Sequence, residues 1–157
     1  MIISGAFAAI ITVLTLFVKI YTVNGYIHLG DSVIYLAACI LPFPYALIAA
    51  GLGGALADTL GSFAIYSVPT FIIKVLITLP YTPKSKRILT KRNSLMVIPA
   101  GIITVVGYFI TGWIFFGWSG AVAGLTGDVI QAAGSAVLFF IIAAALDKIE
   151  FKKNFTA

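Results

Sequence analysis

The sequence predicts an all-α integral membrane protein with six transmembrane helices, whose N- and C-termini are both cytoplasmic. Three observations support this fold class. The chain of 157 residues is 61% hydrophobic and 10% charged, with a mean hydropathy of +1.12, whereas soluble proteins are about half apolar and a quarter charged. Nearly every window of about 20 residues is apolar enough to span a bilayer. Eight of the ten basic residues fall in two short clusters beside apolar segments.

The six predicted helices are separated by short polar or proline-rich breaks. Asp31 is well placed to cap the N-terminus of the second helix, and Pro42 ends it. Pro69 fits the first turn of the fourth helix, and a glycine-rich loop around Trp118 separates the last two. The predicted helices cover residues 2–20, 32–41, 45–62, 69–81, 95–116 and 126–146. Because no hydrophilic stretch of domain length remains, we expect 1–157 to form one transmembrane domain.

The basic residues predict the orientation in the membrane. One cluster follows the fourth helix and the other follows the sixth: Lys84, Lys86, Arg87, Lys91, Arg92, Lys148, Lys152 and Lys153. With six crossings both clusters lie on one side, which the positive-inside rule makes cytoplasmic. The breaks at 21–29, 63–68 and 117–125 then face outward. Five helices, with 32–62 as one bent crossing, would separate the two clusters. The net charge of +5 is therefore interpreted as a topology signal, and no nucleic-acid partner is expected.

Several chemistries are excluded by composition. Cys39 and His28 are the only residues of their types, so there is no internal disulfide and no zinc site of several Cys or His ligands. The sequence has no glycine-rich phosphate loop ending in Lys-Ser or Lys-Thr, so the chain is not expected to hydrolyse ATP. Ser135 lacks a histidine partner for nucleophilic catalysis. We expect no enzymatic activity and no cofactor.

Four charged residues lie in or beside the predicted helices and need an explanation, because a charge in lipid is costly unless it is paired or hydrated. Asp58 and Lys74 fall in the outer halves of adjacent helices, where they are placed to form an ion pair. They either lock the two helices together or line a polar cavity and contact a solute. Asp31 and Asp128 each follow a glycine, and each is predicted to cap an outward helix end. The alternative for Asp31 is contact with a ligand.

Uncharged polar groups near the outward side are further candidates for solute binding. Gln131 is one turn deeper than Asp128, and its amide offers both a donor and an acceptor. It either contacts a ligand or bridges two helices. Tyr108 lies in the outer part of the fifth helix. Asn24 and His28 belong to the first outward loop, which is either simply solvated or a lid over a bound solute.

A small-residue stripe on the first helix, formed by Ser4, Gly5, Ala8 and Ala9, offers a smooth surface for another helix. It either packs against the chain's own helices or docks a partner protein.

The segment from Asn24 to Ala38, NGYIHLGDSVIYLAA, resembles the signature of substrate-binding (S) components of energy-coupling factor (ECF) transporters. That family's pattern is approximately Asn-Gly-Tyr-Ile-Asn-Leu-Gly-Asp. It continues with an Ala-Asp pair on a Gly/Ala-rich helix, matched by Ala57 and Asp58, and with a proline-opened segment bearing a lysine, matched by 69–74. The resemblance covers residues 4–79, and the last two helices agree in hydropathy and length. His28 departs from the family's Asn.

The resemblance implies a six-helix S component that binds a vitamin or precursor from outside. Its partners would be a transmembrane coupling subunit of the EcfT type and two cytoplasmic ATPases, which supply the energy. It also implies that the small-residue stripe meets the coupling subunit. The resemblance further implies that transport involves toppling of the S component in the membrane.

The candidate substrate-binding groups are Asn24, His28, Asp58, Lys74, Tyr108 and Gln131. Few charges and several hydrogen-bonding groups suit a small, neutral, hydroxylated heteroaromatic compound. Hydroxymethylpyrimidine or pyridoxine is the preferred substrate, and relatives with the same signature are assigned to riboflavin and other vitamins. Two other classes stay open. An independent ion-coupled carrier would use Asp31, Asp58 or Asp128 for coupling, and a scaffold protein would bind no solute.

Overall fold

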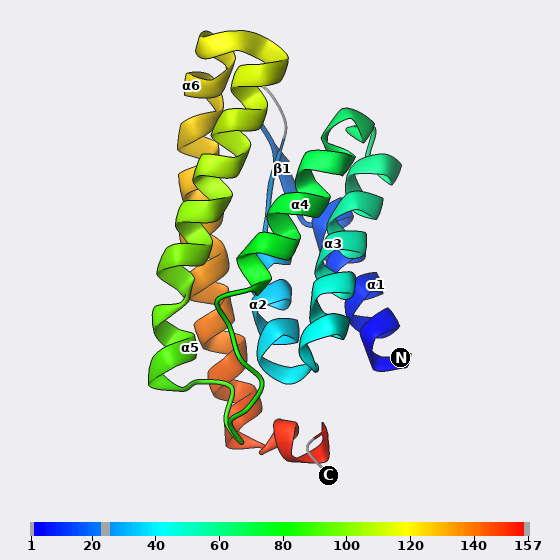
Figure 1. Ribbon diagram of the computed structural model, residues 1–157, viewed down its shortest axis with the longest axis vertical. Helices are drawn as coiled ribbons and strands as arrows, with labels where there is room; N and C mark the ends of the chain where they lie inside the picture. Colours follow the sequence, from blue (N-terminus) through cyan, green and yellow to red (C-terminus); the bar gives the residue numbers. More distant parts are fainter. Residues whose placement is uncertain (1, 23–25, 156–157) are drawn as a thin grey trace.

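The computed structural model describes residues 2–22 and 26–155 of the chain, and most of them are helical (Figure 1). The elements in chain order are α1 (Ile2–Phe17), β1 (Lys19–Tyr21), β2 (Tyr26–His28), α2 (Gly30–Ile40), α3 (Phe43–Leu60), the 3-10 turn η1 (Ala64–Tyr66), α4 (Ser67–Thr78), α5 (Lys91–Leu95), α6 (Val97–Lys148) and the 3-10 turn η2 (Phe151–Phe155).

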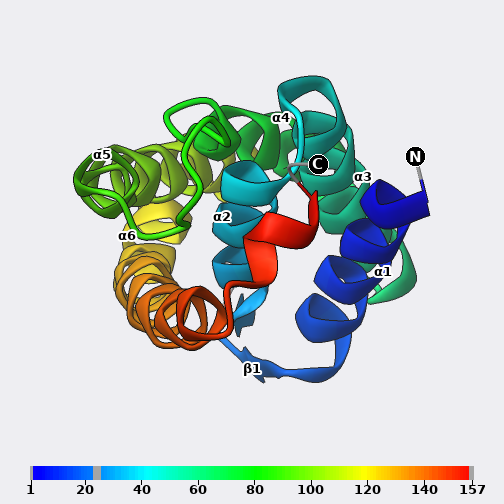
Figure 2. The ribbon, with the colours of Figure 1, turned by 90° about the horizontal axis from the view of Figure 1, so that it is seen from below.

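Helix α2 lies in the middle of the molecule. Figure 2 shows it surrounded by α1, α3, α4 and α6, and all eleven of its residues are buried. Its side chains, among them Ile34 and Tyr35, share one apolar core with Ile77 and Phe139. Eleven helical residues span about 16 Å, well short of the roughly 30 Å of a bilayer's hydrocarbon core. Helix α2 is therefore an internal helix of the bundle.

Glycines on α3 let its neighbours approach closely. A Cβ at Gly53 would lie 2.8 Å from Ile11 Cγ2 of α1 and 3.0 Å from the Ala8 carbonyl oxygen. A Cβ at Gly54 would lie 2.8 Å from Lys74 Cγ of α4. The Gly/Ala-rich sequence of α3 thus lets it pack closely between two helices, as small residues do in membrane bundles.

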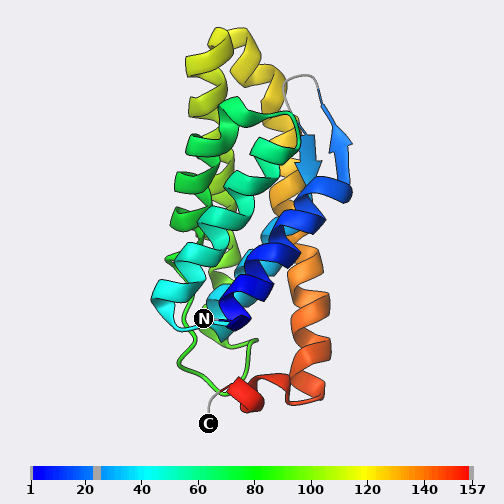
Figure 3. The same cartoon turned by 90° about the vertical axis from the view of Figure 1, so that its right-hand side faces the viewer.

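A short hairpin replaces the first predicted loop. Strands β1 and β2 pair antiparallel, with Lys19 opposite His28 and Tyr21 opposite Tyr26. The hairpin lies along the later part of α6, where Figure 3 shows it. Helix α1 accordingly ends at Phe17, three residues before the predicted end. The expectation of an all-α chain missed these two strands.

Helix α6 contains both of the last two predicted helices. Its only interruption is Gly117, with φ 73° and ψ −176°, and Figure 1 shows its two arms running back alongside each other. Extended backbone at positive φ is essentially confined to glycine. A Cβ at Gly112 would lie 3.3 Å from Ala121 Cα, so the arms touch near the bend. The prediction of a loop over 117–125 is wrong, because one glycine makes the reversal.

The basic clusters lie at the end of the molecule opposite the Gly117 bend. Side-chain hydrogen bonds connect the segments at this end. The Asp147 carboxylate accepts the backbone N–H groups of Ile88 at 2.8 Å and Leu89 at 2.9 Å. Asn93 donates to the carbonyl oxygens of Thr82 and Ile88. The connection between α4 and α5 and the chain's C-terminal turn therefore lie at the same end (Figure 1).

Large apolar side chains cover much of the outer surface, while charged groups lie inside. Ile2, Ile114 and Val68 are at least 70% exposed, whereas Asp31 and Lys74 are fully buried. Two helical stretches within the described residues, Phe43–Leu60 and Lys91–Lys148, are long and apolar enough to cross a membrane. Apolar outside and charged inside is the arrangement expected in lipid.

Candidate functional site

A buried ion pair joins α4 to α2. Lys74 Nζ lies 2.6 Å from Asp31 Oδ1, and both side chains are fully buried. The ion pair predicted between Lys74 and Asp58 is not formed. Asp31 is not a helix cap either, because the N-cap position of α2 is Leu29 and no side chain caps it. In place of both predictions, the structure pairs Lys74 of α4 with Asp31 of α2.

Gln131 extends this pair to a third element. Its Nε2 donates to Asp31 Oδ2 at 3.1 Å, and its Oε1 accepts the backbone N–H of His28 at 3.2 Å. The bridging role predicted for Gln131 is therefore present. His28 is itself buried, and its Nδ1 accepts the backbone N–H of Gly30 at 3.0 Å. The ring proton of neutral His28 then resides on Nε2.

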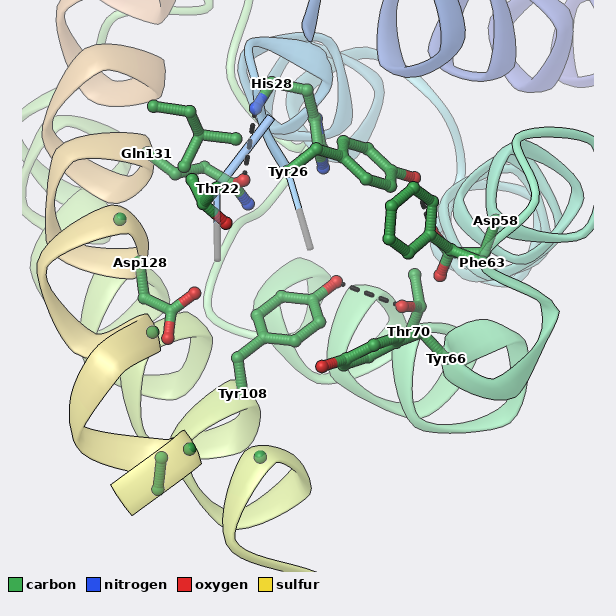
Figure 4. Close-up of a pocket in the computed structure, with 16 residues that line it drawn as sticks. Thr22, Tyr26, His28, Asp58, Phe63, Tyr66, Thr70, Tyr108, Asp128 and Gln131 are labelled. Atoms are coloured by element: carbon green, nitrogen blue, oxygen red, sulfur yellow. Dashed lines mark hydrogen bonds between the residues drawn. The ribbon is translucent and has the colours of Figure 1, made fainter. Parts of the chain in front are cut away.

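A pocket opens beside this hydrogen-bonded chain. Figure 4 shows residues from the hairpin, α3, α4 and both arms of α6 around it. Its aromatic walls include Tyr26, Phe63, Tyr66 and Tyr108. Its complete lining is Thr22, Tyr26, Ile27, His28, Asp58, Phe63, Tyr66, Thr70, Tyr108, Gly112, Gly120, Ala121, Gly124, Gly127, Asp128 and Gln131. Aromatic walls with a few converging polar groups are typical of small-molecule sites.

Two hydrogen bonds between side chains orient groups at the pocket wall. The Tyr26 hydroxyl of β2 donates to Asp58 Oδ1 of α3. The hydroxyls of Thr70 and Tyr108 lie 3.1 Å apart, and the Tyr108 ring lies with its centroid 5.1 Å from Lys74 Nζ. The pocket is thus attached to the buried ion pair through Tyr108 as well as through Gln131.

The structure brings most of the predicted binding residues together. His28, Asp58, Tyr108 and Gln131 line the pocket. Lys74 lies behind the lining, in contact with Asp31. Asn24 lies outside the described residues.

Some lining residues were not predicted as binding residues, and helical spacing would have found two of them. Thr70 is four residues before Lys74 on α4, and Asp128 is three residues before Gln131 on α6. Residues three or four apart share a helix face. The cap predicted for Asp128 is wrong, because Asp128 lies inside α6, eleven residues after the bend. Tyr66 had no such signal, since it precedes α4 in a 3-10 turn.

The small-residue stripe of α1 is divided between two faces. Ser4 is buried and donates its hydroxyl to the Tyr45 carbonyl oxygen at 3.1 Å. The carbonyl oxygen of Ala8 lies against Gly53 of α3. Gly5 and Ala9 are exposed, with open space around Gly5 where a side chain would be.

The described residues contain no group of three or more His, Cys, Asp or Glu side chains that could hold a metal ion. What lines the pocket is suited to noncovalent binding through hydrogen bonds and ring contacts.

Comparisons with known proteins bear on this pocket. A family model described as "ECF-type riboflavin transporter, S component" matches residues 1–148. A protein of Pyrococcus woesei, described as "uncharacterized protein in gap 3'region", is 30% identical over 131 residues, which are 82% of this chain and 88% of that protein. The family match runs from α1 to the end of α6 and so includes every element that lines the pocket.

Proposed function

The chain belongs to the family of ECF-type riboflavin transporter S components, and on that premise we propose that it captures a small vitamin or vitamin precursor for import. The observation that carries the proposal is the pocket, which has aromatic walls and rests against a buried ion pair. Binding residues held by such internal contacts are preorganised, which reduces the entropy lost when a ligand binds.

The proposed substrate is hydroxymethylpyrimidine or pyridoxine, with riboflavin, named in the description of the matching family, as the next candidate. Tyr66 and Tyr108 have ring centroids 6.5 Å apart on one side of the pocket, where they can contact a heteroaromatic ring. Gln131 and His28 offer hydrogen-bonding groups on another side. Asn24, Asp58 and Lys74 complete the proposed site, with Lys74 acting through Asp31 and Tyr108.

We propose that the chain crosses the membrane six times with both termini in the cytoplasm. The chain passes along the bundle six times, through α1, strand β2 with the short helix α2, α3, α4 and the two arms of α6, and these passes together with the exposed apolar side chains support six crossings. The basic residues near α5 and η2, all at one end of the molecule, support the orientation. The pocket would then lie toward the outside.

The proposed partners are a transmembrane coupling subunit of the EcfT type and two cytoplasmic ATPases. Of the small-residue stripe, Gly5 and Ala9 are the members free to meet another helix, since Ser4 and Ala8 face α3. Small exposed residues permit the close backbone approach that helix pairs in lipid favour. Ser4 and Ala8 would then support the docking surface from behind.

An independent ion-coupled carrier is less well supported. Asp31, one of its three candidate coupling groups, is engaged by Lys74 and Gln131. Uptake that followed a proton gradient in vesicles without ATPase partners would favour the carrier instead.

The first test is ligand binding by the full chain, purified in lipid nanodiscs and examined by native mass spectrometry with a panel of vitamins and precursors. One compound is expected to bind with a 1:1 stoichiometry. Tyr108→Phe removes only the hydroxyl beside Thr70 and is expected to weaken binding several-fold. Tyr45→Phe, at the far end of α3, is the matched control. A folded protein that binds nothing in the panel would contradict the proposal.

A further inference from the structure

The charged groups of the pocket lining are carboxylates. Asp58 and Asp128 both line the cavity, and among the residues that the structure describes no lysine or arginine does. Figure 4 shows the two aspartates on opposite sides of the cavity with Tyr108 between them. A ligand in this position therefore meets a carboxyl group on two sides.

The buried cation beside the pocket is already paired with another carboxylate. Lys74 Nζ lies 2.6 Å from Asp31 Oδ1, inside a fully buried pair. Its charge is matched by Asp31, so the pair as a unit is neutral. Asp58 and Asp128 are left over from this pairing.

Lys19, at the edge of the site, is held by aromatic rings. Its Nζ lies 4.8 Å from the ring centroid of Tyr26, 5.2 Å from that of Tyr21 and 6.0 Å from that of Phe63. Such a position over several ring faces stabilises a cation by itself. Lys19 is not among the lining residues, so its ammonium group borders the site without entering it.

The two oxygens of the Asp58 carboxyl differ in their hydrogen bonding. Its Oδ1 accepts the Tyr26 hydroxyl, whereas Oδ2 is buried and has no hydrogen-bond partner within the part of the chain that the structure describes. The residue is 4% exposed, so water reaches this oxygen poorly. A buried acceptor without a donor is costly, and a donor on a bound ligand would remove that cost.

We propose that the pocket selects a small heteroaromatic compound with an amino group, which donates hydrogen bonds to Asp58 or Asp128 and carries or takes up positive charge. The aromatic walls fit such a ligand as well, since ring faces attract cations. Phosphate esters and carboxylates are disfavoured, because they would lie between two carboxylates. This inference rests on the proposed function and narrows its substrate class to compounds that carry an amino group, as hydroxymethylpyrimidine does and pyridoxine does not.

The experiment uses two matched ligand pairs with the full chain in nanodiscs of neutral lipid, measured by calorimetry at neutral pH. Pyridoxamine and pyridoxine differ by an amine in place of a hydroxyl, and hydroxymethylpyrimidine is compared with its deaminated analogue. In whichever pair binds, the amine is expected to bind about tenfold tighter or more, as for a hydrogen bond to a charged group. The phosphate ester of the better ligand is expected to bind at least about tenfold more weakly.

Variants separate the charge from the shape of the pocket. Asp58→Asn and Asp128→Asn keep the side-chain size, and at least one of them is expected to reduce the preference for the amine about tenfold. Tyr26→Phe removes the partner of Oδ1 but keeps the charge of Asp58, so the preference should remain. Glu150→Gln, at an exposed carboxylate outside the pocket, should change nothing.

The inference would be overturned, while the proposed function stands, by equal binding of amine and alcohol, by tighter binding of the phosphate ester, or by an unchanged preference in both Asn variants. Exclusive binding of riboflavin would do the same. Failure of the folded protein to bind any vitamin would overturn the proposed function and this inference together.

Discussion

Lys74 is a charged side chain with no exposed surface, and its surroundings explain how it is tolerated. Asp31 supplies the opposite charge at 2.6 Å, Gly54 leaves room for its aliphatic stem, and the Tyr108 ring lies beside its ammonium group. Asp31 in turn holds Gln131, and Gln131 holds the backbone of β2 at His28. The residue therefore acts at a distance on the pocket wall through a connected set of bonds.

Lys74→Met is expected to destabilise the protein by about 3–5 kcal/mol, because it leaves Asp31 as an unpaired buried charge. The double variant Lys74→Met/Asp31→Asn removes both charges and is expected to recover most of that loss. Thermal unfolding in lipid nanodiscs measures both. Lys153→Met, which breaks an exposed pair with Glu150, is the control and should leave the unfolding temperature unchanged. A single variant as stable as the parent would show that Lys74 is not charged in the folded protein.

Residue types were more predictable than residue partners. The cost of charge in lipid singled out Asp31, Asp58, Lys74 and Asp128 from the sequence alone, and Asp31 and Lys74 proved to be paired with each other. The pairing of Asp31 with Lys74 was missed because the position of a residue along its own helix does not show how far the neighbouring helix is shifted along the bundle axis. Asp31 reaches Lys74 because the hairpin before it delivers the chain to the middle of the bundle.

At the scale of elements, α6 is shaped by a single residue. Gly117→Ala is expected to destabilise the protein by about 1–3 kcal/mol, since Ala adopts this φ and ψ only with strain. The two arms would also separate near the bend, which should reduce ligand binding because Gly112, Ala121 and Asp128 all line the pocket. Unfolding temperature and ligand affinity are the measurements.

Gly101→Ala is the control on the same helix, because a Cβ there would lie an ordinary 3.6 Å from Ala132 Cβ. Glycine is a poorer helix former than alanine, so this variant should be at least as stable as the parent. If Gly117→Ala behaved in the same way, the bend would not depend on the glycine conformation.

The helices were predicted well where apolar runs end at prolines, and poorly where they end by other means. Pro42 marks the break between α2 and α3 as expected. The hairpin was missed because three-residue strands are too short to show an alternating pattern. The loop at 117–125 was predicted from its glycines, but only Gly117 uses the conformational freedom of that residue.

For the molecule as a whole, the outer surface differs from that of a soluble protein. Many large Ile, Val, Leu and Phe side chains are exposed, while the ion pair, Gln131 and His28 lie inside together with an apolar core. The pocket and the basic clusters lie toward opposite ends. Because the two ends of the molecule differ in this way, the proposed orientation can be tested by labelling each end separately.

Cysteine labelling tests that orientation in the full chain. Cys39 is fully buried, and Cys39→Ala provides a background without cysteine. Ser119→Cys, two residues after the bend of α6, should react with a membrane-impermeant maleimide in intact cells. Ser85→Cys, near the basic cluster before α5, should react only in inverted vesicles. Labelling of both cysteines from one side would contradict six crossings with cytoplasmic termini.

The bend at Gly117 also has a consequence for biosynthesis. Because one residue joins the two arms of α6, no hydrophilic loop separates them that could remain in water while only the first arm is inserted. We expect the arms to enter the membrane together as a helical hairpin. The second arm contains Asp128 and Gln131, which would be costly to insert alone. Insertion beside the first arm shields Asp128 and Gln131 from lipid at once. These pocket residues therefore enter the membrane already packed against another helix.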